Sequence, residues 1–194
     1  MNTLLVYAHP NPRSFNAALA QVIEQQITQQ GKQIKVKDLY AMKWNPVLSQ
    51  EDFAGYHSGN LPQDIKQEQA DVAWADLIIM LAPVWWYSVP AILKGYIDRV
   101  FSLGFAYKYT ATGPLGLLKG KRGLFITTSG ANRQDAELGG MMKTLNASLG
   151  GVFGFSGFEE KKHLNLYAVT TVSDDERKLM LTEVRDLVTS FSSR

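Results

Sequence analysis

The stretch Leu77-Ile-Ile-Met-Leu-Ala-Pro-Val-Trp-Trp-Tyr-Ser-Val-Pro-Ala-Ile-Leu-Lys-Gly-Tyr-Ile-Asp-Arg-Val-Phe101 decides the fold class of this chain. Leu77 to Ala82 is a continuous apolar run, which is typical of a strand buried on both faces in a parallel sheet. From Pro90 onward apolar residues recur at helical spacing, and Ser88 stands just ahead as a candidate cap. The stretch therefore predicts a buried strand, a connection and a helix that begins at Pro90, as in α/β proteins.

Three adjacent aromatic residues, Trp85, Trp86 and Tyr87, lie on the predicted connection between this strand and this helix. Connections run over the surface, so adjacent aromatic side chains there need a partner that covers them. One interpretation is that they pack under a neighbouring loop as part of the core. The other is that they support a flat, apolar cofactor at the carboxyl end of the strand.

The same alternation of strand and helix continues along the rest of the chain. We expect four further strands, over residues 3–8, 34–38, 123–128 and 164–169. We expect helices over about 15–30, 62–74 and 139–149 and from residue 174 onward, with no regular element over 39–61 or 104–120. Lys35 and Lys37 place the second strand near the sheet edge. This pattern predicts a single α/β domain over residues 1–194, with a doubly wound five-stranded parallel sheet and helices on both faces.

Composition argues against several classes of protein. A net charge of +2 is too small to indicate binding to nucleic acid or to an anionic membrane surface. The absence of cysteine excludes disulfides, thiol nucleophiles and thiolate metal sites. His9, His57 and His163 are isolated from one another and from carboxylates at ligand spacing, so no metal site is predicted. Without a basic leader or an apolar run of roughly 18–20 residues, a cytoplasmic location is expected.

Three predicted loops meet at the carboxyl edge of the sheet, where doubly wound sheets bind their ligands. The loop 9–16 offers polar groups at a helix N-terminus, the loop 83–87 offers aromatics, and the loop 127–130 offers small polar residues. That inventory suits a phosphate attached to a flat ring system. The sequence lacks the glycine-rich motifs of a Rossmann dinucleotide site and of a nucleotide triphosphatase. Gly151, Gly154 and Gly157 precede no such helix, and we interpret them as turn and packing residues.

The first of these loops is open to two interpretations. Ser14 and Asn16 begin a helix whose free N–H groups and dipole favour an anion. Ser14 is also an ordinary N-cap residue, and capping uses the same geometry as phosphate binding. His9, at the end of the first strand, is equally suited to bind a phosphate or to stabilise the turn.

The three loops together resemble one known family, the flavodoxin-like NAD(P)H:quinone oxidoreductases. The matching passages are His9-x-x-x-x-Ser14-Phe-Asn16, Pro83 to Phe101 with Phe105-Ala-Tyr107, and Thr127-Thr128-Ser129-Gly130. The resemblance implies a flavodoxin-like fold and a homodimer with a flavin in each of two interface sites. It implies hydride transfer from NAD(P)H to the flavin, followed by two-electron reduction of a quinone or similar acceptor.

The resemblance extends to ancillary subunits of glutathione-gated potassium efflux systems. The alternative function is therefore a flavin-binding regulatory subunit that docks on a membrane transporter.

The resemblance also implies a role for individual residues. It places four residues around the phosphate end of the flavin: His9, Ser14, Phe15 and Asn16. It lines the isoalloxazine ring with Pro83, Val84, Trp85, Trp86 and Tyr87. Near the polar edge of that ring it places the third loop, with the residues Thr127, Thr128, Ser129 and Gly130. Tyr107 and Tyr109 match tyrosines that reach over the partner's site, and with Trp86 they are the predicted catalytic residues.

Two departures from the family pattern affect these expectations. The longer, animal-type enzymes carry a Tyr and a His after the third loop that assist hydride transfer, and Ala131 to Met142 contains neither. Those enzymes also have a longer segment after the position of Asp52, part of which faces the FAD adenine. Here the chain passes quickly from Asp52 to Gly59, so we expect FMN rather than FAD.

Overall fold

The computed structural model describes residues 1–192 and contains a five-stranded sheet with strand order β2-β1-β3-β6-β7. All neighbouring pairs in this sheet are parallel. The strands are β1 (Asn2–Tyr7), β2 (Gln33–Asp38), β3 (Leu77–Pro83), β6 (Arg122–Thr128) and β7 (Glu160–Leu166). The predicted doubly wound parallel sheet is confirmed, and β2 lies at its edge as expected.

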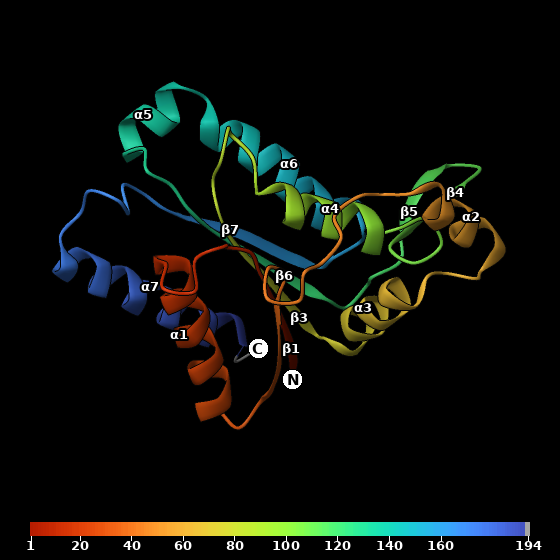
Figure 1. Cartoon of the computed structure of the whole chain (residues 1–194), viewed down its shortest axis with the longest axis horizontal. Coiled ribbons are helices and arrows are strands. Elements are labelled where there is room, and N and C mark those ends of the chain that lie inside the picture. Colours follow the sequence, from red (N-terminus) through yellow and green to blue (C-terminus); the bar gives the residue numbers. More distant parts are fainter. Residues whose placement is uncertain (193–194) are drawn as a thin grey trace.

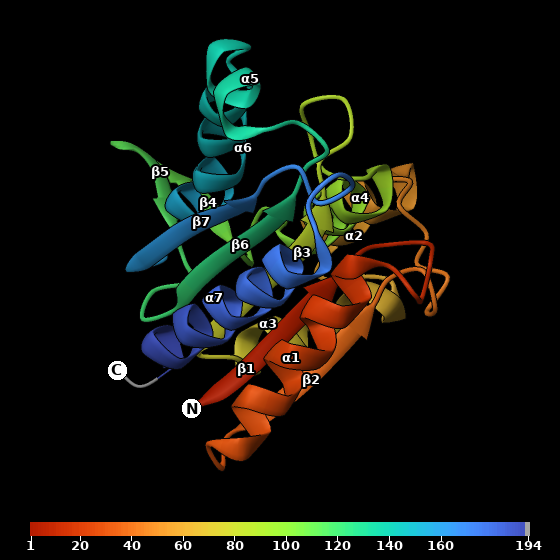
Figure 2. The same cartoon turned by 90° about the vertical axis from the view of Figure 1, so that its left-hand side faces the viewer.

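Helices cover both faces of the sheet, as Figures 1 and 2 show. One face packs against α1 (Phe15–Gln29) and α7 (Asp174–Ser192). The other packs against α3 (Gln63–Trp74), α4 (Ala91–Val100) and α6 (Met141–Phe155). Successive residues of β3 enter these two cores in turn and every one is buried, which explains the continuous apolar run in the sequence.

No regular element was expected over residues 39–61, but this segment contains α2 (Gln50–Ser58). Ser49 caps this helix through a capping box with Asp52, a signal that the sequence does carry. Arg99 of α4 holds α2 in place: its guanidinium donates to both carboxylate oxygens of Asp52, at 2.8 and 3.1 Å. Both side chains are buried, so α2 is attached to the body of the protein by an ion pair.

The segment 104–120 also contains regular structure that the sequence analysis missed. Strands β4 (Tyr107–Thr110) and β5 (Gly113–Gly116) form a separate antiparallel hairpin. These strands are only four residues long and mostly exposed, so they lack the alternation of apolar and polar residues that reveals a half-buried strand.

In the C-terminal half of the chain, the predicted bounds of one helix and one strand are wrong. The helix expected over 139–149 is α6, which continues to Phe155, and a short helix just before it, α5 (Arg133–Leu138), was not expected. Gly151 and Gly154 therefore lie inside α6 rather than in turns. The strand expected over 164–169 is β7, which begins at Glu160 and ends at Leu166. Its first half is polar, as suits a strand at the sheet edge, so hydrophobicity did not reveal it.

The start of α4 differs by one residue from the expectation. Pro90 is the N-cap and α4 begins at Ala91, while Ser88 caps nothing and instead pairs with Trp85 in a turn. Among the helices of residues 1–192, none is long and apolar enough to cross a membrane.

Candidate functional site

The structure brings the three predicted loops together at the carboxyl edge of the sheet. Val84 donates its N–H to the carbonyl oxygen of Thr128 at 2.8 Å, which joins the second loop to the third. Asn16 donates from Nδ2 to Thr128 Oγ1, also at 2.8 Å, which joins the first loop to the third. Asn16 and Thr128 are both buried, so these contacts are shielded from water. Parallel neighbours β1, β3 and β6 thus place their following loops side by side.

The N-terminus of α1 presents unused hydrogen-bond donors to this edge. Ser14 caps the helix by accepting from the N–H of Ala17 at 3.1 Å, which confirms the capping role. Within residues 1–192, the N–H groups of Phe15 and Asn16 have no hydrogen-bond acceptor. Two open N–H groups at the positive end of a 15-residue helix form a donor set that suits an anion such as a phosphate.

Two buried polar atoms beside this helix end also lack partners in the described part of the chain. They are Asn16 Oδ1 and the hydroxyl of Tyr7, which lies near Ser14 at the end of β1. Burial raises the pKa of Tyr7, the Ser14 hydroxyl opposes that effect, and the phenol remains a neutral donor at pH 7. Buried polar atoms are nearly always satisfied, so both are suited to hydroxyl groups of a ligand. Tyr7 is not among the site residues predicted from the sequence.

The aromatic residues form a tight turn, Trp85–Ser88, that we call the aromatic turn. Trp85 and Ser88 exchange both backbone hydrogen bonds, at 2.8 and 3.0 Å. The two residues between them, Trp86 and Tyr87, have φ of 52° and 60°. This left-handed conformation costs a residue with a side chain about 1–2 kcal/mol, and glycine normally takes such positions.

The aromatic turn is not part of the core. The side chain of Trp86 is 98% exposed, and Trp85 and Tyr87 are also exposed. The interpretation that these residues pack under a loop is therefore wrong. Strained backbone that displays bulky apolar groups to solvent is typical of a binding site.

His9 lies next to the aromatic turn and has one observed role. Its Nδ1 accepts from the N–H of Asn11 at 3.0 Å, which stabilises the loop after β1. Its ring is 6.1 Å from that of Trp85, centre to centre, and tilted to it by 60°. The turn-stabilising interpretation is thus observed, and within residues 1–192 Nε2 has no hydrogen-bond partner.

In the third loop, the side chains are used within the protein. Thr127 Oγ1 donates to Asn165 Oδ1 at 2.8 Å, and Asn165 Nδ2 donates to Ser129 Oγ at 3.1 Å. Thr127, Thr128 and Ser129 are all buried, whereas Gly130 is exposed. A ligand at this edge would therefore meet the main chain of the third loop.

His163 of β7 completes this network, although its sequence position gave no reason to expect a contact. Its Nε2 lies 2.7 Å from Thr127 Oγ1 and its Nδ1 lies 2.7 Å from Asn146 Oδ1. Burial lowers the pKa of His163 to about 4, so the imidazole is neutral at pH 7. The pairing of β6 with β7, which places Asn165 beside Thr127, is the signal that could have revealed this network.

Tyr107 and Tyr109 lie away from the three loops. They belong to the β4–β5 hairpin, where the ring of Tyr107 packs edge-on against Phe155 of α6 at 4.8 Å between ring centres. Figure 1 shows the hairpin beside the last turn of α6, whereas the aromatic turn lies near the first turn. Within one chain the predicted catalytic residues are thus divided between two regions.

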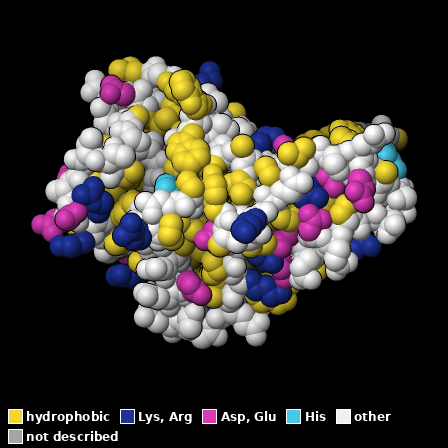
Figure 3. All heavy atoms as spheres, in the orientation of Figure 1, with side chains coloured by type: hydrophobic (Ala, Val, Ile, Leu, Met, Phe, Trp, Pro, Cys, Tyr) yellow, Lys and Arg dark blue, Asp and Glu magenta, His cyan; other side chains and the backbone are white. Residues whose placement is uncertain are grey.

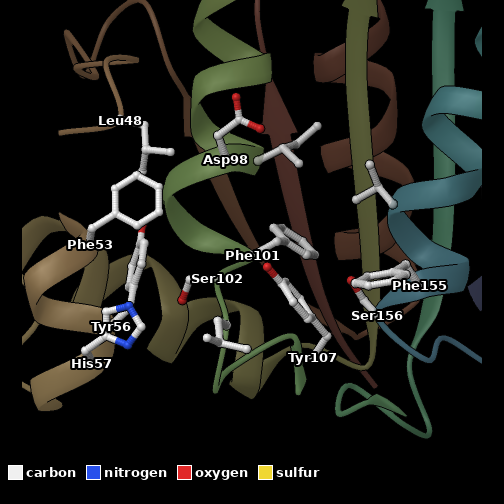
Figure 4. A pocket seen from close by; sticks show the side chains of 13 residues that line it. Leu48, Phe53, Tyr56, His57, Asp98, Phe101, Ser102, Tyr107, Phe155 and Ser156 are labelled. Atoms are coloured by element: carbon white, nitrogen blue, oxygen red, sulfur yellow. The ribbon is translucent and has the colours of Figure 1, made fainter. Parts of the chain in front are cut away.

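Tyr107 lines a hollow of about 400 Å³ that we call the α2 hollow. Its walls are α2, the end of α4, the hairpin and the end of α6, and the lining is mainly apolar, with several aromatic side chains. Figure 4 shows Phe53, Tyr56 and His57 of α2 facing Phe101, Tyr107 and Phe155 across it. An apolar hollow with a few polar groups is suited to a flat organic molecule.

The comparison with protein families identifies the chain. The family described as having a flavodoxin-like fold matches residues 1–187. This chain belongs to that family.

Similar proteins include two oxidoreductases of known sequence and one of known structure. An uncharacterized NAD(P)H oxidoreductase of Haemophilus influenzae is 41% identical over 183 residues, which cover 93% of this chain and 91% of that protein. The ribosyldihydronicotinamide dehydrogenase [quinone] of Homo sapiens is 35% identical over 199 residues, covering 92% and 86%. The structure of an NAD(P)H:quinone oxidoreductase from Methanothermobacter marburgensis aligns with a TM-score of 0.88 at 25% identity, covering 100% and 98%.

Proposed function

We propose that this chain is a flavin-dependent NAD(P)H oxidoreductase that transfers two electrons to quinones or similar acceptors. The observation that carries this proposal is an exposed, strained aromatic turn beside an open helix N-terminus at one edge of the sheet. An aromatic shelf next to a phosphate-binding helix end fits a flavin nucleotide. Its relatives in Haemophilus influenzae and Homo sapiens are named as an oxidoreductase and a quinone dehydrogenase, which supports the same chemistry.

FMN is the proposed cofactor, held by the chain's own residues. The N–H groups of Phe15 and Asn16, with Ser14 and His9 beside them, would bind the phosphate. The residues of the second loop would support the ring: Pro83, Val84, Trp85, Trp86 and Tyr87. The residues of the third loop, Thr127, Thr128, Ser129 and Gly130, would border the polar edge of the ring, mainly through their main chain. A bound flavin supplies the hydride-accepting chemistry, while the protein binds and orients the reactants.

The active form is proposed to be a homodimer in which each chain completes the partner's site. Trp86 sits on the aromatic turn, whereas Tyr107 and Tyr109 sit on the distant hairpin. Figure 3 shows a band of hydrophobic side chains across the face that carries α4, α6 and α2. Exposed apolar residues of that size usually mark an interface, and here they include Phe53, Tyr109 and Phe155.

The alternative, a regulatory subunit docked on a potassium efflux transporter, receives no support from the relatives reported above. We propose instead a single-domain, cytoplasmic enzyme over residues 1–194 with a small-molecule acceptor.

A spectrum of the purified protein, followed by turnover, tests the proposal. We expect a yellow protein with about one flavin per chain, identified as FMN by mass after release, and steady NAD(P)H-dependent reduction of menadione. A colourless protein that takes up neither FMN nor FAD would overturn it. Bound flavin without turnover on any quinone would favour the regulatory function instead.

Sedimentation combined with a mixing experiment tests the shared site. We expect a dimer, and we expect Tyr109→Ala mixed with Trp86→Ala to recover activity after subunit exchange, because one site of each mixed dimer is then intact. A fully active monomer would contradict the proposal.

A further inference from the structure

The aromatic turn needs stabilising contacts with other segments, because the left-handed backbone conformation of Trp86 and Tyr87 is unfavourable. Two bulky residues in the left-handed region would relax to an ordinary turn unless neighbouring contacts prevented it. The hydrogen bonds between Trp85 and Ser88 close the turn, and the bond from Val84 to Thr128 attaches its base. Neither contact involves the two strained residues. Trp86 is almost fully exposed, so any further support must come through Tyr87.

The side chain of Tyr87 extends to the junction of α5 and α6 and ends against Gly139. A Cβ atom at position 139 would lie only 2.7 Å from the Tyr87 hydroxyl oxygen, far inside van der Waals contact. The next nearest ring atom, Cζ, would be 3.8 Å away, an ordinary contact. The hydroxyl therefore occupies the space that any side chain at this position would fill. Figure 1 shows the connection between β3 and α4 rising to this junction.

The backbone of Gly139 does not require glycine. Gly139 ends α5 with φ −73° and ψ −2°, a right-handed conformation that every residue adopts. The neighbouring Gly140 is different, since its φ of 74° accounts for glycine there. At position 139 the missing side chain matters for the space it leaves to Tyr87.

We propose that Gly139 is a positioning residue for the flavin site. Its missing side chain leaves room for the Tyr87 hydroxyl, so the Tyr87 ring can lie at the α5–α6 junction and the aromatic turn keeps the shape that supports the flavin ring. The inference rests on the proposed function, because the ligand of the turn is the proposed FMN. It also explains how α5 and α6, which contribute none of the predicted site residues, take part in the site.

Gly139→Ala is the direct test, and Gly150→Ala is its matched control. The first change places a methyl group against the Tyr87 hydroxyl, which can swing away because it is the end of a side chain. The second lies in α6, where an added Cβ meets nothing within 4 Å. We expect FMN binding to the stripped protein to be about tenfold weaker in Gly139→Ala and unchanged in Gly150→Ala, since aromatic contacts to the ring are lost.

Tyr87→Phe turns this test into a double-mutant cycle. Removing the hydroxyl removes the atom at 2.7 Å, so Gly139→Ala should have an effect of less than about twofold in the Tyr87→Phe background. A methyl group at position 139 would also lie 3.0 Å from the Asp135 carbonyl oxygen. That contact is the same in both backgrounds, so the cycle cancels it. Rescue by Tyr87→Phe therefore separates a positioning effect from local damage to α5.

The tryptophan emission of the stripped proteins gives a readout without flavin. Gly139→Ala should change the emission spectrum, because Trp85 and Trp86 move with the turn, and Tyr87→Phe should restore it. Unchanged FMN affinity and emission in Gly139→Ala, or a failure of Tyr87→Phe to rescue, would overturn the inference. A wild-type protein that binds no flavin would instead overturn the proposed function, and the emission would still test the contact.

Discussion

The carboxyl edge of the sheet and the α2 hollow are built in opposite ways. At the edge, neutral hydrogen bonds join three loops, and the aromatic side chains of the turn stay exposed. Around the hollow, a buried ion pair between Arg99 and Asp52 attaches a whole helix, and the aromatic side chains face one another across a cavity. The edge offers binding groups without enclosing a ligand, and the hollow encloses space without offering an anion site. The two regions are complementary, as expected if sites form between two chains.

The largest expected effect tests whether the edge binds a phosphate. Ser14→Asp should leave the fold intact, because aspartate caps a helix about as well as serine. A carboxylate about 4 Å from a phosphate would repel it by roughly 4 kcal/mol, which lowers FMN affinity by about three orders of magnitude. Fluorescence quenching of FMN and thermal unfolding of the stripped protein measure the two quantities.

Ser14→Asn is the matched control, because asparagine caps the helix without adding a charge. It should lose far less affinity than Ser14→Asp. Equal affinities for these two variants would remove the end of α1 from the phosphate site.

The next prediction concerns the free energy of unfolding and tests the ion pair that attaches α2 beside the hollow. Asp52→Asn leaves the buried Arg99 with a weakened partner, so we expect a loss of about 3 kcal/mol in the free energy of unfolding. Asp98→Asn removes an exposed carboxylate that pairs with Lys94 and should change stability by less than about 0.5 kcal/mol. Urea denaturation measures both, and similar values would show that the ion pair does not hold α2.

The same ion pair predicts a pH dependence. Burial alone would raise the pKa of Asp52, but hydrogen bonds from Arg99 and Ser49 lower it below its ordinary value of 3.8. A lowered pKa in the folded state means that ionised Asp52 stabilises the protein above about pH 4 and that this stability is lost as the pH falls further. Between about pH 4 and pH 2, stability should fall less steeply in Asp52→Asn than in the wild type. Parallel pH profiles would contradict this prediction.

The smallest effect tests whether the strain in the aromatic turn serves binding. Trp86→Gly removes the side chain from a residue in the left-handed conformation. The free energy of unfolding of the stripped protein should therefore rise by about 0.5 kcal/mol, after the greater backbone entropy of glycine in the unfolded chain is subtracted. FMN affinity should fall about fivefold, since one aromatic contact with the ring is lost. Lys43 also has a positive φ, 53°, and lies outside both regions. Lys43→Gly should therefore give the same gain in stability without any loss of FMN affinity. Equal FMN affinity in the two variants would show that Trp86 does not touch the flavin.

Some of the site followed directly from local sequence signals. Ser14 before an amphipathic run predicted the start of α1, and Pro83 to Tyr87 after an apolar run predicted an aromatic connection at a strand end. Both expectations depend on neighbours within a few residues, and both are confirmed. The helix α2 carried a local signal too, the Ser49–Asp52 capping box, but its weak periodicity concealed it.

Other parts depended on contacts between distant residues and left no local trace. His163 and Asn165 meet Thr127 only because β7 pairs with β6, and the boundary of β7 was itself misplaced. The left-handed conformation of Trp86 and Tyr87 contradicts their own preferences, so sequence reasoning would assign it to glycine or asparagine instead.

The sequence by itself determined the sheet, its layers and the sheet edge at which we propose that the flavin binds. These features follow from hydrophobic periodicity and from the fact that parallel strands end on the same side. Only the tertiary structure decided where the predicted site residues lie: Tyr87 reaches Gly139 fifty-two positions away, while Tyr107 lines a separate hollow. The physical reason is that packing between elements determines the space left for each side chain and the backbone strain that a turn retains. The hydrophobic periodicity of a single element predicts neither of them.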